Sequence, residues 1–100
     1  MVRHIIMFRF IDVKDPEDCM QKANRIKAAF APLRNIINVV ESYEVAINEK
    51  STDFSYDVAL ISEYNTWRDL DTYLKHPEHQ KAISSCKDIK KEKAVIDYEF

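Results

Sequence analysis

The sequence predicts an α+β domain of the ferredoxin-like type, a βαββαβ chain whose four antiparallel strands form one sheet with the helices on one face. Three observations support this prediction. Four short segments alternate apolar and polar residues with the period of a strand. Two longer segments between them repeat apolar residues at helical spacing. The 100 residues are 46% hydrophobic, which suffices for one core, so we expect a single domain over residues 1–100.

The first predicted strand covers residues 2–11, and both of its faces are partly apolar. One face carries Val2, His4, Ile6, Phe8 and Phe10. The other carries Arg3, Ile5, Met7, Arg9 and Ile11. The first face is apolar apart from its histidine, so it needs full cover. The second is apolar at its centre, as expected of a surface that meets a partner sheet or chain.

A helix is predicted to start after Asp15. Asp15 is a typical cap, Pro16 suits the first helical position, and acidic residues occupy the first turn. One apolar stripe follows at spacings of three and four, namely Cys19, Ala23, Ile26, Phe30 and Leu33. Pro32 predicts that the helix ends near Ala31, and residues 33–38 are expected to turn the chain.

The second and third strands are predicted at residues 39–48 and 56–64. A short polar loop separates them, so they should pair as an antiparallel hairpin. The predicted inward residues are Val39, Tyr43, Val45 and Ile47 on one strand and Tyr56, Val58, Leu60, Ser62 and Tyr64 on the other. The chain has no glycine, which excludes every glycine-rich phosphate-binding loop. Backbone positions with positive φ should therefore fall on Asn35, Asn48 or Asp53.

The second helical region is predicted to start at Thr66, which forms a capping box with Asp69. Pro77 interrupts this region, and residues 78–86 can continue as a second helical segment. His76 precedes the proline and is predicted to cap that segment. Residues 94–100 form the last predicted strand, with Ala94, Ile96, Tyr98 and Phe100 opposite Val95, Asp97 and Glu99. Residues 87–93, where acids interrupt the lysines, are predicted to be a solvated loop.

A homodimer is predicted, because one face of the sheet would be apolar and left uncovered by the helices. Helices can cover one face only, and a second set of apolar residues would crowd the other. This set is Ile5, Met7, Ile11, Ala59, Ile61 and Val95. Exposed apolar sheet faces usually mark interfaces, and a symmetric dimer is the commonest way to bury one.

Composition excludes several other partners. The net charge is −2 and no basic stripe with interleaved aromatics occurs, so no nucleic acid is expected. Arg3, His4 and Arg9 interrupt the N-terminal apolar residues, so neither a signal peptide nor a membrane span is predicted. We expect a cytoplasmic protein with Cys19 and Cys86 as reduced thiols. No metal is predicted, because a proline separates His76 from His79 and no third ligand follows at a suitable spacing.

Four stretches resemble the stress-responsive dimeric α/β-barrel (Dabb) family. They are VRHIIMFRF at 2–10, YDVAL at 56–60, YLKHPEHQ at 73–80 and IDY at 96–98. The resemblance covers essentially the whole chain. It implies a homodimer whose two sheets face each other as a barrel. In a plant member of the family, the tyrosine and second histidine of the third stretch carry out an aldol-type cyclisation. Those roles would fall on Tyr73 and His79, with His4 lining the pocket.

The protein is predicted to bind a small apolar or aromatic ligand between sheet and helices. It is predicted to catalyse acid/base chemistry of the cyclase, lyase or isomerase type on this ligand, without a cofactor. A neutral imidazole at His79 would take a proton, and the phenol of Tyr73 would donate to the oxygen that becomes negative. The pocket is predicted to be lined by His4, Ile6, Phe8, Phe30, Val58, Leu60, Trp67 and Ile96.

Two other interpretations remain open. In the first, the protein is a non-catalytic stress or binding protein, in which His79 bonds backbone freed by the proline and Tyr73 only packs. In the second, it is a monooxygenase that acts without a cofactor, another use of the dimeric barrel. An open cavity that joins the imidazoles and the phenol would favour acid/base chemistry over a filled core.

Overall fold

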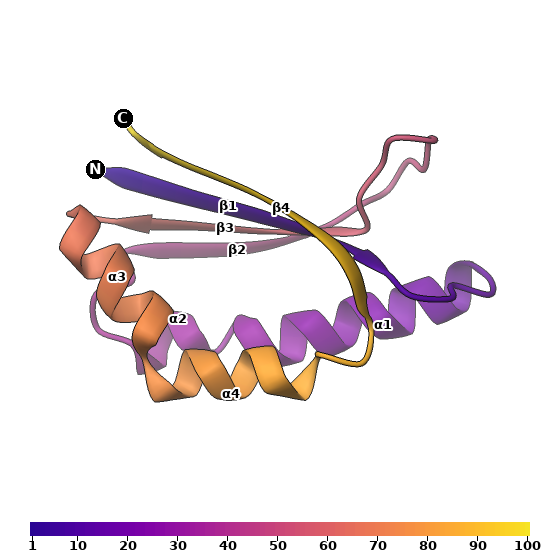
Figure 1. Ribbon diagram of the computed structural model, residues 1–100, viewed down its shortest axis with the longest axis horizontal. Helices are drawn as coiled ribbons and strands as arrows, with labels where there is room; N and C mark the ends of the chain where they lie inside the picture. The colour runs from indigo at the N-terminus through magenta and orange to yellow at the C-terminus, as the bar shows by residue number, and fades with distance from the viewer.

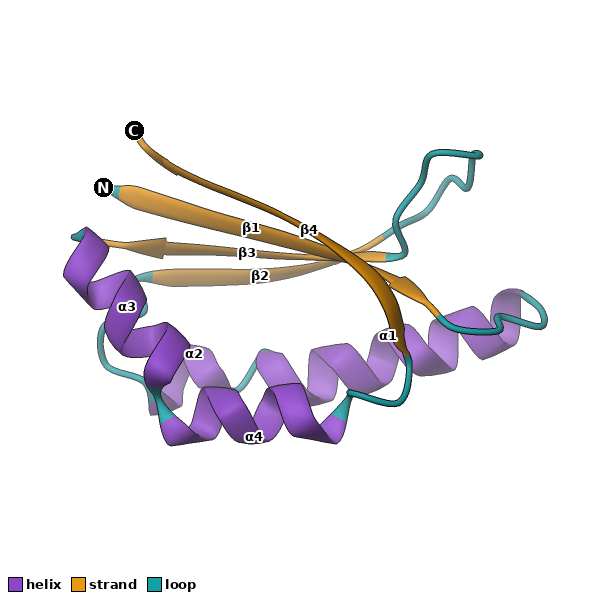
Figure 2. Cartoon of the chain, viewed as in Figure 1, coloured by secondary structure: helices purple, strands orange, loops and turns teal.

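The computed structural model describes all residues, 1–100, and contains one four-stranded antiparallel sheet with every helix on one face (Figures 1 and 2). The strands lie in the order β2-β3-β1-β4. In chain order the elements are β1 (Val2–Phe10), α1 (Pro16–Phe30), α2 (Leu33–Ile36), β2 (Ser42–Ile47), β3 (Val58–Tyr64), α3 (Trp67–Lys75), α4 (Pro77–Ser85) and β4 (Lys90–Glu99). The predicted ferredoxin-like α+β fold is therefore confirmed.

β1 is a central strand, and its register fixes which residues of its neighbours share a face. Ile5 lies opposite Ile61 of β3 and Ile96 of β4. The alternate residues His4 and Phe8 point to the helices and are buried. The core lies on this side, and its members are Val2, Phe8, Phe10, Ala23, Ile26, Phe30, Leu33, Ile37, Val40, Val58, Leu60, Tyr64, Leu70, Tyr73, Ala82, Cys86 and Ile89.

α1 begins and ends where its sequence predicts. The Asp15 carboxylate accepts a hydrogen bond of 2.8 Å from the Asp18 amide, and Pro16 occupies the first turn. Phe30 ends the helix ahead of Pro32. The short helix α2 follows, although residues 33–38 were expected only to turn. Pro32 has φ −63°, the value that the start of a helix requires, so a proline that ends one helix also starts the next.

The last strand is longer than predicted, because β4 begins at Lys90 and not at Ala94. The expectation of a loop over residues 90–93 was wrong, although Lys91, Glu92 and Lys93 are exposed as expected. Lysine and glutamate carry no strand signal of their own, and here contacts to β1 hold them. The Arg9 guanidinium pairs with Glu92 at 3.0 Å, and the Lys90 ammonium lies 4.8 Å from the centre of the Phe8 ring. β2 is shorter than predicted and starts at Ser42.

The backbone has one residue with positive φ, and it is none of those predicted. Asp12 has φ 49°, whereas Asn35, Asn48 and Asp53 have negative φ. Asp12 lies between the end of β1 and the cap of α1, where the chain leaves the sheet and enters the helix layer. In a chain without glycine, the left-handed position is thus filled by an aspartate.

We predict that Asp12→Val lowers the free energy of unfolding by about 1–2 kcal/mol, because a β-branched side chain is disfavoured at positive φ. Asp12→Asn should stay within about 0.5 kcal/mol of the wild type, since asparagine tolerates this conformation. Urea denaturation of both variants measures the difference. Equal stability of the two variants would contradict the prediction.

Candidate functional site

A cavity of about 380 Å³ lies between the helix-facing side of the sheet and the helices, toward the β4 edge. Its lining comes from three strands, β1, β3 and β4, and from α1, α3 and α4. The lining residues are His4, Ile6, Phe8, Phe30, Leu60, Tyr73, Leu74, His79, Gln80, Ile83, Lys90, Lys93, Val95 and Asp97. Apolar walls with a few converging polar groups are the usual form of a small-molecule site.

The joint between α3 and α4 places the second histidine of the YLKHPEHQ stretch. Pro77 has no amide hydrogen, so the helix cannot continue through it. His76 ends α3 and caps α4, and its Nδ1 accepts a hydrogen bond of 3.1 Å from the Glu78 amide. In an unbroken helix that amide would donate to the carbonyl of Leu74. Because of the break, the Leu74 carbonyl has no backbone donor from Glu78 and is bonded by side chains of the next turn.

His79 uses this carbonyl. Its Nδ1 lies 3.0 Å from the Leu74 oxygen, and because a carbonyl only accepts, Nδ1 carries the proton. The imidazole is 8% exposed, and burial lowers its pKa below the ordinary value of 6.5. The ring is therefore neutral near pH 7, with Nε2 free to accept a proton.

Tyr73 lies against His79, with 4.4 Å between the ring centres. Its hydroxyl is 2.8 Å from the hydroxyl of Tyr43 on β2. Burial raises the pKa of both phenols far above their ordinary value, so neither ionises near neutral pH. Tyr73 can act as a hydrogen-bond donor and not as a base. Its role as an acid/base residue remains a proposal.

His4 is the second imidazole of the cavity, and it is paired with a residue that sequence reasoning did not select. His4 lies opposite Asp97 in the β1–β4 register, and its Nδ1 donates to the Asp97 carboxylate. His4 is 6% exposed. No buried side-chain nitrogen or oxygen lacks a hydrogen-bond partner, yet no protein group bonds Nε2 of His4 or of His79. Neither Nε2 atom is therefore completely buried.

The structure brings together seven of the residues proposed from the sequence and separates three others. The cavity is lined by His4, Ile6, Phe8, Phe30, Leu60, Tyr73 and His79. Val58 belongs to the packed core and does not line the cavity. Trp67 is 46% exposed at the start of α3, where its Nε1 bonds Glu99.

Ile96 also lies outside the cavity, because the two faces of β4 were assigned the wrong way round. It pairs with Ile5 on the open face and is 57% exposed, whereas Val95 pairs with Ile6 and lines the cavity. Asp97 was missed for this reason, because it shares a face with Val95, whereas Lys93 was missed because residues 87–93 were predicted to be a loop. Pairing each charge of the last strand with His4 or Phe8 of β1 would have found them.

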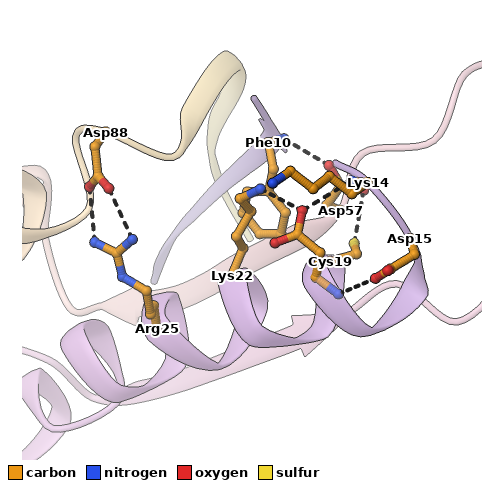
Figure 3. Close-up of polar contacts among 9 residues, drawn as sticks. Phe10, Lys14, Asp15, Cys19, Lys22, Arg25, Asp57 and Asp88 are labelled. Carbon is orange, nitrogen blue, oxygen red and sulfur yellow. Dashed lines mark hydrogen bonds and ion pairs between the residues drawn. The ribbon is translucent and has the colours of Figure 1, made fainter. Parts of the chain in front are cut away.

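Neither cysteine lines the cavity. The Cys19 thiol lies 3.6 Å from the Asp57 carboxylate near the start of α1 (Figure 3), and burial followed by that carboxylate raises its pKa. Cys86 is buried. No group of three or more His, Cys, Asp or Glu side chains is arranged to hold a metal ion. The helices are all too short or too polar to cross a membrane.

The element order and the four-stranded antiparallel sheet, with every helix on one face, place the chain in the class of ferredoxin-like α+β domains. The model of the Stress responsive A/B Barrel Domain family (Dabb) matches residues 2–100. The chain belongs to this family.

Similar proteins support the fold. An uncharacterised protein of Streptomyces coelicolor is 28% identical over 100 residues, with both chains fully covered. A dimeric protein of unknown function from Bacteroides fragilis has a ferredoxin-like fold and is 32% identical. Its crystal structure matches with a TM-score of 0.86 over 99% of this chain and 95% of that chain. Hydroxynitrile lyase from Passiflora edulis is 16% identical, with a TM-score of 0.77 over 97% of this chain and 90% of that chain.

We predict that His79 makes the protein less stable in mild acid. Above its ordinary pKa of 6.5 the ring is neutral in both the folded and the unfolded chain. As the pH falls below this value, the unfolded chain binds a proton that the folded chain excludes, so stability is lost until the pH passes the lowered folded pKa. Urea denaturation between about pH 7.5 and about pH 5 should show a shallower loss for His79→Gln than for the wild type. Parallel curves would contradict this.

Proposed function

We propose that the protein is a homodimer whose cavity binds a small organic ligand and performs acid/base chemistry on it, of the lyase, cyclase or isomerase type. The observation that carries the proposal is the state of the two imidazoles. In both His4 and His79 the Nδ1 proton is bound to a fixed acceptor, Nε2 has no protein partner, and the residue lines the cavity. Such nitrogens can accept a proton or a hydrogen bond from a ligand.

His79 is the proposed base. A neutral imidazole can remove a proton from a carbon beside a carbonyl, and the Leu74 carbonyl holds the ring in the tautomer that this requires. The lowered pKa keeps the base unprotonated at neutral pH.

Tyr73 is the proposed donor to the oxygen that becomes negative. In this scheme the Tyr43 hydroxyl donates to the Tyr73 oxygen, which leaves the Tyr73 proton for a ligand oxygen. Burial favours this role, because a donor in an apolar site stabilises developing charge more than one in water. His4 is a positioning residue in this scheme, and its bond to Asp97 fixes the ring.

The proposed dimer uses the open face of the sheet. Ile5, Ile61 and Ile96 form one row across three strands of this face. At its edge the Arg3 guanidinium pairs with Glu63 at 2.7 Å and lies over the Phe100 ring at 4.0 Å, so its charge is already satisfied. The Bacteroides fragilis protein, 32% identical, is described as dimeric. A second copy of this chain would bury the apolar row.

We predict that the protein accelerates exchange of α-hydrogens in D2O, followed by proton NMR over a panel of small ketones and β-keto esters. His79→Gln should lower the exchange rate by about 100-fold or more, because it removes the base. Tyr73→Phe should lower it by about 100-fold, because it removes the donor.

Matched variants control for packing. Tyr64→Phe removes a phenol that bonds Ser62 at 2.9 Å and does not line the cavity, so exchange should be unchanged. His76→Asn keeps a capping side chain and should also leave exchange unchanged. No exchange above background with any member of the panel would reject acid/base chemistry and favour the non-catalytic alternative.

We predict that Ile5→Glu converts a dimer into a monomer in sedimentation velocity at micromolar concentration, because two charges would be buried at the centre of the open face. Met20→Glu makes the same kind of change on an exposed residue of α1 and should leave the dimer intact. A monomeric wild type, or a dimeric Ile5→Glu variant, would refute the interface.

A further inference from the structure

We propose that the ligand of this cavity is a small organic carboxylate, with its anionic end held by Lys90 and Lys93 and its apolar body against Ile6, Phe8 and Leu60. This inference rests on the proposed function in one respect, namely that the cavity is a ligand site. It adds the substrate class, and its evidence is the charge of the cavity wall and not the chemistry of the imidazoles.

The two lysines reach the cavity from the same end of β4. Lys93 lies opposite Phe8 in the β1–β4 register, and so it shares the helix-facing side with that buried ring. The ammonium of Lys90 lies 4.8 Å from the centre of the same ring. Both side chains line the cavity. The strand bulge after Lys90, where the pairing with β1 shifts between Arg9 and Phe10, allows both to point to one side.

Neither lysine has an acidic partner. The seven ion pairs of the protein include three lysines, and none of them is Lys90 or Lys93. Asp97 is the one carboxylate of the cavity lining, and His4 already occupies it. The cavity wall therefore carries two cations against one anion, an excess of positive charge in a protein of net charge −2.

The ammonium of Lys90 is partly buried and has no acidic partner. Burial lowers the pKa of its ammonium, and the neighbouring Lys93 lowers it further, while the Cys86 thiol acts the other way. A carboxylate between the two ammonium groups would supply the missing partner. The neutral base His79 and the donor Tyr73 would then face the rest of the ligand. Apolar walls and a cationic end together favour an amphipathic acid over a polyanion such as a nucleotide.

The test compares isosteric charged and neutral probes, 3-phenylpropanoate and 3-phenylpropanamide, in NMR titrations of the full chain at low ionic strength. The wild type should bind the carboxylate at least about tenfold more tightly than the amide. The double variant Lys90→Met, Lys93→Met should lose this preference by weakening the carboxylate about tenfold or more while leaving the amide unchanged. Lys93→Met alone changes an exposed side chain and should lose part of the preference with the fold intact.

Lys91→Met is the matched control, because it removes the same charge from the same strand at an exposed residue that does not line the cavity. It should keep the wild-type preference, as should the charge-preserving double variant Lys90→Arg, Lys93→Arg. Equal binding of the two probes by the wild type, absence of carboxylate binding, or an equal loss in Lys91→Met would overturn the inference. Because the readout is binding, selective carboxylate binding without hydrogen exchange would uphold this inference while the acid/base function fails. Hydrogen exchange in neutral ketones, together with equal binding of the carboxylate and the amide, would uphold the acid/base function while this inference fails.

Discussion

The arrangement of the cavity depends on one interruption, the missing amide hydrogen of Pro77. Because Pro77 cannot donate, α3 ends, the Glu78 amide turns to His76, and the Leu74 carbonyl is released from the helical ladder. Two side chains of the following turn then satisfy that carbonyl, the His79 imidazole at 3.0 Å and the Gln80 amide at 2.7 Å. The same break that separates two helices thus fixes the tautomer and the direction of the ring that faces the cavity. A continuous helix would keep the Leu74 carbonyl occupied by backbone and leave His79 without an anchor.

A second constraint is the difference between the two faces of the sheet. All four helices lie on one side (Figure 2), where most of the core packs and where a cavity opens toward the β4 edge. Polar residues face inward at that edge, where they line a cavity instead of the packed core. His4 and Asp97 illustrate this, since both point to the helix side and pair with each other across neighbouring strands. A buried polar group such as His4 is stable only when partnered, and the more exposed Asp97 supplies the partner.

Sequence patterns predicted most of the fold, for reasons that are visible in particular residues. The caps Asp15 and Thr66 and the breaks at Pro32 and Pro77 act over a few residues, so they mark helix ends locally. The clear alternation of β1 likewise identified His4, Ile6 and Phe8 as inward. β4 had no such contrast, because Val95 and Ile96 are equally apolar and the lysines before them carry no strand signal. Its face depends on pairing with β1, which is a tertiary property. The position of Asp12 at positive φ was also out of reach, since it follows from where the chain crosses between layers.

The alternation of side chains between the two faces of β4 has a consequence for how this chain can diversify. Along the strand, odd positions from 93 to 97 line the cavity, whereas the even position 96 lies on the opposite face beside Ile5. Neighbouring residues of β4 therefore belong to two surfaces on opposite faces of the sheet. Ligand preference could drift through the odd positions without altering the sheet surface on the other side, and the reverse also holds. Such separation lets one scaffold acquire new small-molecule partners by single replacements while its architecture stays constant.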